Sequence, residues 1–487
     1  MDITLQYICP PEKDSDAAEL YYRTEGKIIQ KENCLILKNG SRIRTNTYMN
    51  LLDESAWQRY TRLTEWELRI RIKGCGKIRV YGWSEGKEEL LSEAEISSSQ
   101  TVERIFRGEF QNRMIYFELI AEGELEMEQA RYLTNIKETA RDIHISLIIC
   151  TYHRKNAVLR NQEIIRRSSF FDLSSEYYRG LDLKIIDNGA ELEKTEEDNI
   201  EVIYNPNTGG SGGFSRGILA SRCDEEKYGT THLIFMDDDV EITAETFYRL
   251  YSLLRLLKDE YSETVVGGRM FRMDRREIQY TASEVWNGGN IIHIGENQDM
   301  TRWENLPEMN SRSGEYSGWW FACFTMDFAR ENLPLPFFLH CDDVEYGLRH
   351  GGMPIILNGI QVWHETYEYR KSMMVEYYDT RNSLIVNTLR DVFQDPRNVW
   401  ENCEKRLDDH WNKKEYDMAY AVCIGLLDYA KGKEYFFKQG SRRKKIEPSI
   451  LFGYKWVVAF LWRIAFIKYR ISGKKAFFSY KKIKEQY

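Results

Sequence analysis

Four short apolar runs constrain the fold of this chain more than any other feature. They are ISLIIC from residue 145, LKIIDNG from 183, EVIYNPN from 201 and HLIFMDDD from 232. Each is rich in β-branched residues and nearly continuous, as in strands that are buried on both faces. Charged, helix-compatible segments separate the first run from the second and the third from the fourth. The pattern predicts βαβ units around a mainly parallel sheet.

Polar residues follow these runs directly, as TYHR, DNGA and DDD. Ligands of such sheets bind at the carboxyl ends of the strands, so we expect the three polar clusters to share one crevice. A period of two places Asp237 and Asp239 on one side of the strand and Asp238 on the other. Paired carboxylates are favourable around magnesium or manganese. An acidic loop or a helix cap is the alternative interpretation.

Two further motifs carry side chains of the same kind. HCDDVEYGLR contains Asp342, Asp343 and Glu345, although a helix that opens with acids in its first turn has the same appearance. VWHETY places His364 after a short apolar segment. Imidazole completes some transition-metal sites, and it also packs in cores or lies on surfaces.

A glycine-rich stretch, NPNTGGSGGFSRG, lies between the third and fourth runs. It allows the backbone to approach a ligand closely, or it forms a flexible surface turn. It lacks both the lysine of a GxxxxGK[ST] loop and the GxGxxG spacing, which disfavours a P-loop NTPase and a dinucleotide dehydrogenase. The pair Trp319–Trp320 offers apolar platforms for sugar faces, with a core role as the alternative.

Composition narrows the class of protein. The 487 residues include nine cysteines without a CxxC pair, which favours reduced thiols in a cytosolic protein over a disulfide framework. The first residues, MDITLQYICPPEKDSD, do not have the pattern of a signal peptide. The net charge is −8, yet residues 441–487 hold 13 lysines and arginines and only two acids. A basic tail on an acidic body suggests an anionic surface as partner for the tail, and it disfavours nucleic-acid binding by the body.

Three regions are expected. Residues 1–140 contain alternating strands such as TEWELRIRI, typical of a β-sandwich, which we interpret as an accessory domain. Residues 141–375 form the α/β domain. Residues 376–487 form a helical region that ends in a basic amphipathic tail next to a membrane.

The order of motifs resembles a known family. ICTYHR, IIDNGA, NPNTGGSGGFSRG, FMDDDVE, SGWWFACF, HCDDVEYGLR and VWHETY follow one another as in family 2 glycosyltransferases of GT-A fold. Within that family the chain looks most like the polymerising galactofuranosyltransferases of the mycobacterial arabinogalactan pathway. The resemblance implies an inverting, metal-dependent transferase that moves galactofuranose from UDP-galactofuranose to a glycan or lipid-linked acceptor in cell-surface polysaccharide synthesis.

The resemblance also implies roles for individual residues. The residues expected to bind the uridine and ribose of the donor are Thr151, Arg154 and Asp187. Those expected to bind its diphosphate and sugar are Asn207, Gly209, Gly210, Asp237 and Asp238. Those expected to bind the divalent metal, Mn²⁺ or Mg²⁺, are Asp237, Asp239 and His364. Asp343 is expected to be the general base, with Asp342, Trp319 and Trp320 against the acceptor.

Two positions depart from the family pattern. Cys341 replaces a tryptophan before the two acids, and the residues after His364 are ETY instead of an apolar-aromatic pair. Both departures concern the acceptor side. A transferase of the same fold that uses another donor, rhamnosyl or hexosyl, is the first alternative. The second is an inactive glycan-binding module, which the intact Asp237, Asp239, Asp343 and His364 disfavour.

The last segment, ILFGYKWVVAFLWRIAFI, is close to the lower length limit of a spanning helix and contains Lys455 and Arg463. A helix in the membrane interface accommodates these charges, with Trp456, Phe460 and Trp462 at the boundary. We therefore expect a peripheral protein at the inner face of a bacterial cell membrane. A helix that packs on the α/β domain or on a second copy of the chain, in a homo-oligomer, is the alternative.

Overall fold

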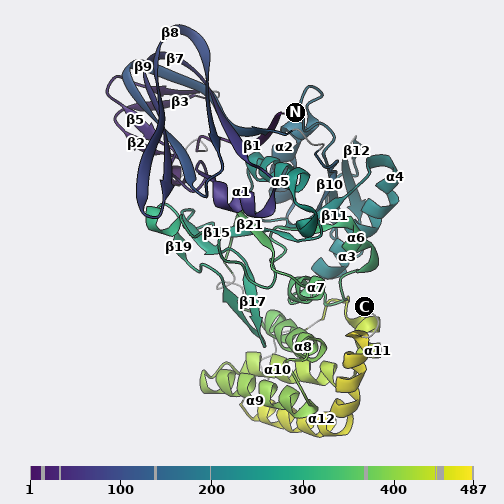
Figure 1. Ribbon diagram of the computed structural model, residues 1–487. Coiled ribbons are helices and arrows are strands. Elements are labelled where there is room, and N and C mark those ends of the chain that lie inside the picture. Colours follow the sequence, from purple (N-terminus) through teal and green to yellow (C-terminus); the bar gives the residue numbers. More distant parts are fainter. Residues whose placement is uncertain are drawn as a thin grey trace.

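The computed structural model describes residues 2–11, 17–31, 34–136, 140–197, 199–366, 371–444, 446 and 455–484. Strands dominate the first part of the chain, a sheet flanked by helices forms the middle, and helices alone form the last part (Figure 1). Residues 450–454, the start of the expected tail helix, lie outside the described residues.

The first part is one antiparallel sheet of nine strands. Trp66, Leu68, Ile70 and Ile72 of the alternating stretch are all buried, because alternate side chains of a strand point to the same face. The longest strands, β7, β8 and β9, pair along most of their length. The edge of β9 that faces away from β7 pairs with β6, β5, β4 and β1. The strands therefore share one hydrogen-bonded sheet, whereas the alternation predicted a sandwich of two. The strands are β1 (Asp2–Tyr7), β2 (Arg23–Glu25), β3 (Ile28–Lys31), β4 (Cys34–Leu37), β5 (Arg42–Arg44), β6 (Leu52–Asp53), β7 (Glu65–Ser84), β8 (Lys87–Glu109) and β9 (Met114–Asn135).

The middle sheet is mixed. Its parallel half has the strand order β13-β11-β10-β14 and contains the four apolar runs, which are almost wholly buried. Its other half is largely antiparallel, although β21 runs parallel to β15. The strands are β10 (Ile145–Thr151), β11 (Leu181–Asp187), β12 (Glu196–Glu197), β13 (Ile200–Tyr204), β14 (His232–Asp237), β15 (Val266–Arg272), β16 (Ile278–Thr281), β19 (Gln298–Asp299), β20 (Ala322–Thr325) and β21 (Ile355–His364). A separate hairpin joins β17 (Glu284–Asn287) to β18 (Asn290–His293).

Helices connect and cover these strands. The expected crossovers are α2, between β10 and β11, and α3, between β13 and β14. The helices of the first two parts are α1 (Glu54–Tyr60), α2 (Lys155–Arg166), α3 (Gly209–Cys223), α4 (Glu225–Tyr228), α5 (Ala244–Leu256), α6 (Met326–Glu331) and α7 (Asp342–His350).

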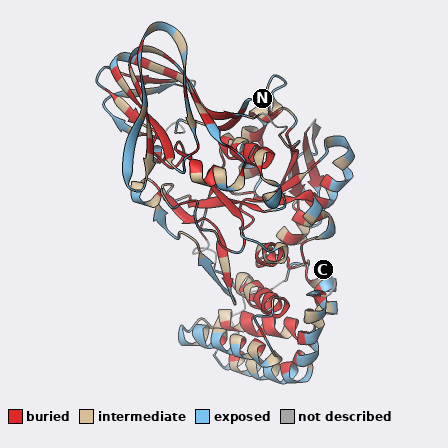
Figure 2. Ribbon diagram, in the orientation of Figure 1, coloured by how far each residue is buried: buried red, intermediate tan, exposed pale blue. Residues whose placement is uncertain are grey.

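The last part packs around an apolar cluster that includes Leu384, Val422 and Phe477 and extends to Phe337 and Val344 of the middle part. Its helices are α8 (Met373–Leu389), α9 (Pro396–Asn412), α10 (Tyr416–Tyr429), α11 (Lys433–Gln439) and α12 (Lys455–Lys484). Asp395 caps α9 in a capping box, with proline at the first helical position. Figure 2 shows buried faces turned inward and exposed faces outward in this part. The helix α12 is thus a packed part of the fold along one face.

Buried polar contacts join the first sheet to the middle one. The guanidinium of Arg249 in α5 is fully buried and donates to the carbonyls of Asn358 (2.8 Å) and Met49 (3.1 Å). The amide of Asn358 donates in turn to the carbonyl of Tyr48 (2.9 Å). Strand β21 therefore carries this junction near its middle and His364 at its end.

Candidate active site

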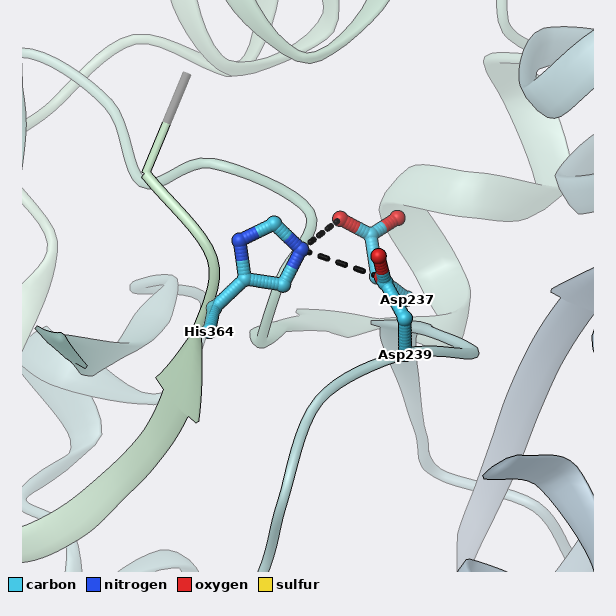
Figure 3. A group of neighbouring side chains, drawn as sticks. All are labelled: Asp237, Asp239 and His364. Atoms are coloured by element: carbon cyan, nitrogen blue, oxygen red, sulfur yellow. Dashed lines mark hydrogen bonds and ion pairs between the residues drawn. The ribbon is translucent and has the colours of Figure 1, made fainter. Parts of the chain in front are cut away.

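Two carboxylates and an imidazole converge at the carboxyl edge of the middle sheet. The His364 Nε2 atom lies 3.1 Å from Asp239 Oδ1 and 3.7 Å from Asp237 Oδ2 (Figure 3). One ligand atom of each residue falls within 4.8 Å of the other two. Among the described residues this is the one cluster of three or more potential ligands whose atoms lie so close. Two oxygens and one nitrogen at such spacing fit a divalent metal.

The chain brings these residues together through an antiparallel bridge. Strand β14 ends at Asp237, and the next residues turn so that Glu241 and Trp363 exchange two backbone hydrogen bonds of 2.8 and 3.0 Å. That bridge holds the acidic turn beside the end of β21, although β14 and β21 are not neighbours in the sheet. The convergence therefore depends on the turn as well as on the strand.

Asp238 points away from the other two acids, into a polar cluster. Its carboxylate accepts a hydrogen bond from the Thr151 hydroxyl (2.7 Å) and pairs with the Arg154 guanidinium (3.1 Å). Arg154 also pairs with Asp239. Burial raises the pKa of Asp238, while Thr151 and Arg154 lower it. Thr151, Arg154 and Asp238, all expected at the nucleotide, thus form one cluster beside the candidate metal site.

Asp187 shapes the loop that follows β11. Its carboxylate accepts hydrogen bonds from the backbone N–H groups of Gly189, Glu191 and Leu192, at 2.7 to 2.8 Å, and it is buried. Both oxygens are therefore engaged in shaping the loop after β11. The expected contact between this carboxylate and a uridine stays a prediction.

The glycine-rich stretch begins helix α3 and is not a flexible turn. Gly209 has a φ of +74°, and a Cβ there would meet the carbonyl oxygen of Phe338 at 2.0 Å. A Cβ on Gly213 would meet the Cys150 sulfur at 2.0 Å, so this glycine lets α3 pack closely on β10. Asn207 accepts a hydrogen bond from the Gly209 N–H (3.1 Å). Part of the glycine pattern thus serves packing, while Gly209 and Gly210 form the N-terminus of α3 at the crevice.

Asp342 and Asp343 open helix α7 next to that N-terminus. The Ser211 hydroxyl donates to Asp342 (2.9 Å), and Asp342 lies 3.5 Å from the position of a Cβ on Gly210. Burial raises the pKa of Asp342. Burial, the neighbouring Asp342 and Glu284 together raise the pKa of Asp343 well above its ordinary value. A carboxyl group with a raised pKa is suited to accept a proton near neutral pH.

Both acidic clusters lie near the end of β10. Burial raises the pKa of the Cys150 thiol, and the charges of Asp238, Asp237 and Asp342 raise it further. One thiol at the end of β10 therefore experiences carboxylates of both clusters. Glu345, the third acid of HCDDVEYGLR, does not join either cluster. It pairs with Arg349 (3.0 Å) and Arg390 (3.1 Å).

Trp319 and Trp320 lie in the core, which corrects the expectation of sugar platforms. The Trp320 indole donates to the carbonyl of Gly268 (2.7 Å) and is 1% exposed. Trp319 is 4% exposed and packs edge-on against Phe214 and Phe235, with ring centroids 4.9 and 5.1 Å away. Neither ring offers an open face, because side chains of α3 and β14 cover Trp319 and the main apolar core encloses Trp320.

Three charged residues of this region were not expected from the sequence. Glu284 in β17 faces Asp343 closely enough to raise its pKa. His340 pairs with Asp379 of α8, with 2.9 Å between Nδ1 and Oδ1. The position of His340 two residues before Asp342 was a usable signal. Glu284 and Asp379 carry no local motif, and the fold alone brings them close.

Comparisons with known proteins agree with this geometry. Residues 146–326 match the family model described as Glycosyl transferase family 2, and residues 5–135 match the model described as Galactofuranosyltransferase 2 N-terminal. The middle domain is a glycosyltransferase family 2 domain. The resemblance drawn from the motifs is thereby confirmed, and the middle domain has the GT-A fold of that family.

Two curated relatives carry the same name. The galactofuranosyltransferase GlfT2 of Mycobacterium tuberculosis is 22% identical over 384 residues, which cover 71% of this chain and 58% of that protein. GlfT2 of Mycolicibacterium smegmatis is 22% identical over 387 residues, which cover 72% of this chain and 58% of that protein. The match thus spans less than two thirds of the relatives' length.

Among solved structures, the mannosyltransferase PcManGT from Pyrobaculum calidifontis in complex with GDP-Man and Mn²⁺ superposes with a TM-score of 0.33. It is 10% identical, and the match covers 73% of this chain and 91% of that one. A superposition this loose says nothing about ligands or reaction.

Proposed function

We propose that the chain is an inverting, divalent-metal-dependent glycosyltransferase that transfers galactofuranose from UDP-galactofuranose to a glycan or lipid-linked acceptor. The observation that carries the proposal is the convergence of Asp237, Asp239 and His364 within 4.8 Å at the edge of the sheet. A protein with no need of a metal would gain little from holding two carboxylates so close. The name of the two mycobacterial relatives supports galactofuranose as the sugar.

The donor set favours manganese over magnesium. Asp237 and Asp239 offer the oxygen ligands that both ions accept, whereas the imidazole of His364 suits a transition metal better. When bound, the metal supplies Lewis-acid chemistry that neutralises a diphosphate leaving group. The N-terminal N–H groups of α3, at Gly209 and Gly210, provide a second favourable environment for the same phosphates.

The second acidic cluster is assigned to the acceptor. Asp343, with its raised pKa, takes the proton from the acceptor hydroxyl as that oxygen attacks the anomeric carbon, and the sugar's configuration inverts. Asp342 is held by Ser211 beside the glycine turn, where it positions the acceptor. One cluster thus serves the leaving group and the other the nucleophile.

The test is a donor panel with the purified full chain and Mn²⁺. UDP-galactofuranose, UDP-galactopyranose, UDP-glucose and dTDP-rhamnose are supplied with synthetic lipid-linked glycan acceptors, and products are identified by mass spectrometry. We expect transfer with UDP-galactofuranose and its loss in EDTA. Transfer from dTDP-rhamnose alone would replace the donor, and absence of metal-dependent consumption of every nucleotide sugar would overturn the proposed function.

We further propose that α12 lies against an anionic membrane surface. Its outward face carries an apolar stripe at helical spacing, formed by the exposed residues Trp456, Phe460, Ile467, Ile471 and Phe478. Exposed cations flank the stripe, among them Lys468, Arg470, Lys474 and Lys475. No helix among the described residues is long and apolar enough to cross a bilayer. An amphipathic face of this kind binds in the interface plane.

The structure changes how this second proposal is tested. Removing residues 441–487 would also remove Val458, Ala465 and Phe477 from the core of the helical part. We therefore use Ile467→Ser/Ile471→Ser, which alters only exposed side chains, with Leu173→Ser, equally exposed on the middle domain, as the matched control. The double variant is expected to lose sedimentation with vesicles of phosphatidylcholine and phosphatidylserine. Unchanged sedimentation would refute the membrane role, and self-association that the double variant abolishes would instead assign the stripe to a second copy.

A further inference from the structure

The loop that leads into α7 has an unusual backbone. Phe338, His340 and Cys341 have φ values of +76°, +63° and +62°. Non-glycine residues in this left-handed region carry a conformational cost, so surrounding contacts must hold them there. The same loop ends at Asp342 and Asp343. Whatever holds the loop therefore also fixes the direction in which the two acids leave it.

Helix α8 supplies the contacts that hold the loop. The Asn382 side-chain amide donates to the carbonyls of Leu339 (2.6 Å) and His340 (2.9 Å). One turn earlier on the same face, Asp379 accepts from the His340 ring at 2.9 Å. The amide thus fixes the backbone of the loop, and the carboxylate fixes its one imidazole side chain.

Charged residues of α9 contact Asp379 and its neighbour Glu376. Arg406 lies 3.8 Å from Asp379 and 2.5 Å from Glu376, and Glu376 also lies 3.2 Å from His410. Burial alone raises the pKa of Asp379, yet His340 and Arg406 outweigh burial and lower it. Asp379 is therefore ionised at neutral pH and available to hold a cation.

The charges around His340 favour the imidazolium. Burial lowers the pKa of His340, but Asp379 and the two aspartates of α7 outweigh burial and raise the pKa to about 9. The same cation lowers the pKa values of Asp342 and Asp343, against the burial that raises them. The other groups that face this region are Glu284, which raises the pKa of Asp343, and the Cys341 thiol, whose pKa burial raises.

We propose that the His340 imidazolium, held by Asp379, is a positioning residue that keeps the aspartate pair of α7 in its carboxylate form. The inference rests on the proposed function, because the pair matters as a proton acceptor in glycosyl transfer. It assigns α8 and α9 a part in the reaction, since both hold the cation from outside the GT-A domain. The cation does not touch the reacting atoms. It acts through the charge it places beside the pair.

The experiment measures the pH profile of kcat/KM for the full chain with Mn²⁺ and the donor that the panel selects. His340→Asn is neutral and tolerates the left-handed backbone. His340→Lys keeps a cation, and Asp379→Asn removes its partner. Without the cation the pair holds its proton up to higher pH, so the acid limb of the profile should move up by about one pH unit in His340→Asn and Asp379→Asn. His340→Lys should restore it, and donor affinity should stay unchanged in all three.

His350→Gln is the matched control, because it changes a histidine at the other end of α7, where the ring contacts the backbone of Gly351 and Glu263. An unshifted acid limb in His340→Asn, or an equal shift in His340→Lys, would overturn the inference. If His340→Asn does not fold, Asp379→Asn and His340→Lys decide by the same criteria.

A second measurement does not depend on activity. Imidazole ¹⁵N NMR with labelled histidine should show the His340 ring protonated beyond pH 8 in the wild type and titrating lower in Asp379→Asn. A ring that is neutral at pH 7.5 in the wild type would refute the inference directly. A wild type without metal-dependent transfer but with this titration would refute the proposed function and leave the ion pair intact, so the two failures are distinguishable.

Discussion

The two acidic clusters of the crevice handle negative charge in opposite ways. Asp237 and Asp239 lie at a strand end beside two nitrogen-containing groups, His364 and Arg154, which pair with them. Asp342 and Asp343 lie at the start of a helix, where burial raises both pKa values and the charge of Asp342 raises that of Asp343 further. The first arrangement attracts a cation and the second attracts a proton. The same residue type thus acquires two chemistries from its surroundings alone.

The largest expected effect breaks the first cluster. Asp239→Ala removes one of the three proposed metal ligands, so turnover should fall by about 10³-fold or more, and Mn²⁺ binding measured by electron paramagnetic resonance should weaken in parallel. Glu304→Ala, at an exposed carboxylate far from the crevice, is the control. Full activity of the wild type in EDTA would contradict the assignment of this cluster.

The next effect separates the clusters by function. Asp343→Asn keeps the shape of the side chain but cannot accept the proton, so transfer should fall by about 10²–10⁴-fold. Affinities for Mn²⁺ and for the nucleotide sugar, measured by calorimetry, should stay at wild-type values. If Asp342→Asn were inactive while Asp343→Asn transferred normally, the roles of the two acids would be exchanged.

A smaller effect concerns stability, and its sign differs between the clusters. Because the folded-state pKa of Asp343 is raised, its contribution to stability is present below the unfolded pKa and is lost as pH rises through the folded pKa. Asp343→Asn should therefore raise the free energy of unfolding at pH 8 by about 1 kcal/mol, and less at pH 5. Asp239→Asn loses ion pairs and should lower it by up to about 1 kcal/mol. Thermal unfolding at both pH values measures this, and stabilisation of both variants alike would contradict the comparison.

The smallest effect refines the second cluster. The Ser211 hydroxyl lowers the pKa of Asp342 by its hydrogen bond, so Ser211→Ala should raise that pKa and slow transfer by a few fold, most clearly below neutral pH. The apparent affinity for Mn²⁺ should not change, since Ser211 lies in the other cluster. A loss of metal affinity in this variant would show that the two clusters are not separate.

The sequence predicted the part of the site that sits on regular strands. The four apolar runs are buried strands, and Asp237 ends one of them as the pattern required. The position of His364 after an apolar segment, which is strand β21, left its role open, and the family resemblance implied that it binds a metal. These predictions succeed because strand ends gather at one edge of a sheet whatever the detailed packing.

Other expectations were wrong because one sequence pattern fits two structural roles, and only the packing of the fold decides between them. The sequence of an aromatic pair such as Trp319–Trp320 does not distinguish a pair that faces a ligand from a pair that packs in a core. Gly213 reads the same whether a ligand or strand β10 approaches it. Asp379 lies 36 residues beyond Asp343 on another helix, so no local pattern joins it to the site. The assignments of metal, base and donor contacts stay predictions until the variants above are measured.

The late position of strand β21 in the chain affects the order in which the fold forms during synthesis. The first sheet is complete once Asn135 has been made, whereas its buried partner Asn358 and the imidazole of His364 emerge more than 200 residues later. On a ribosome, a chain interrupted before residue 355 would carry both aspartates of the first cluster but neither the imidazole nor the strand that seals the junction. The growing polypeptide therefore exposes the surface of its first sheet until the strand that completes the candidate metal site arrives. Chaperones that recognise unfinished surfaces would encounter this chain while more than 200 residues are added.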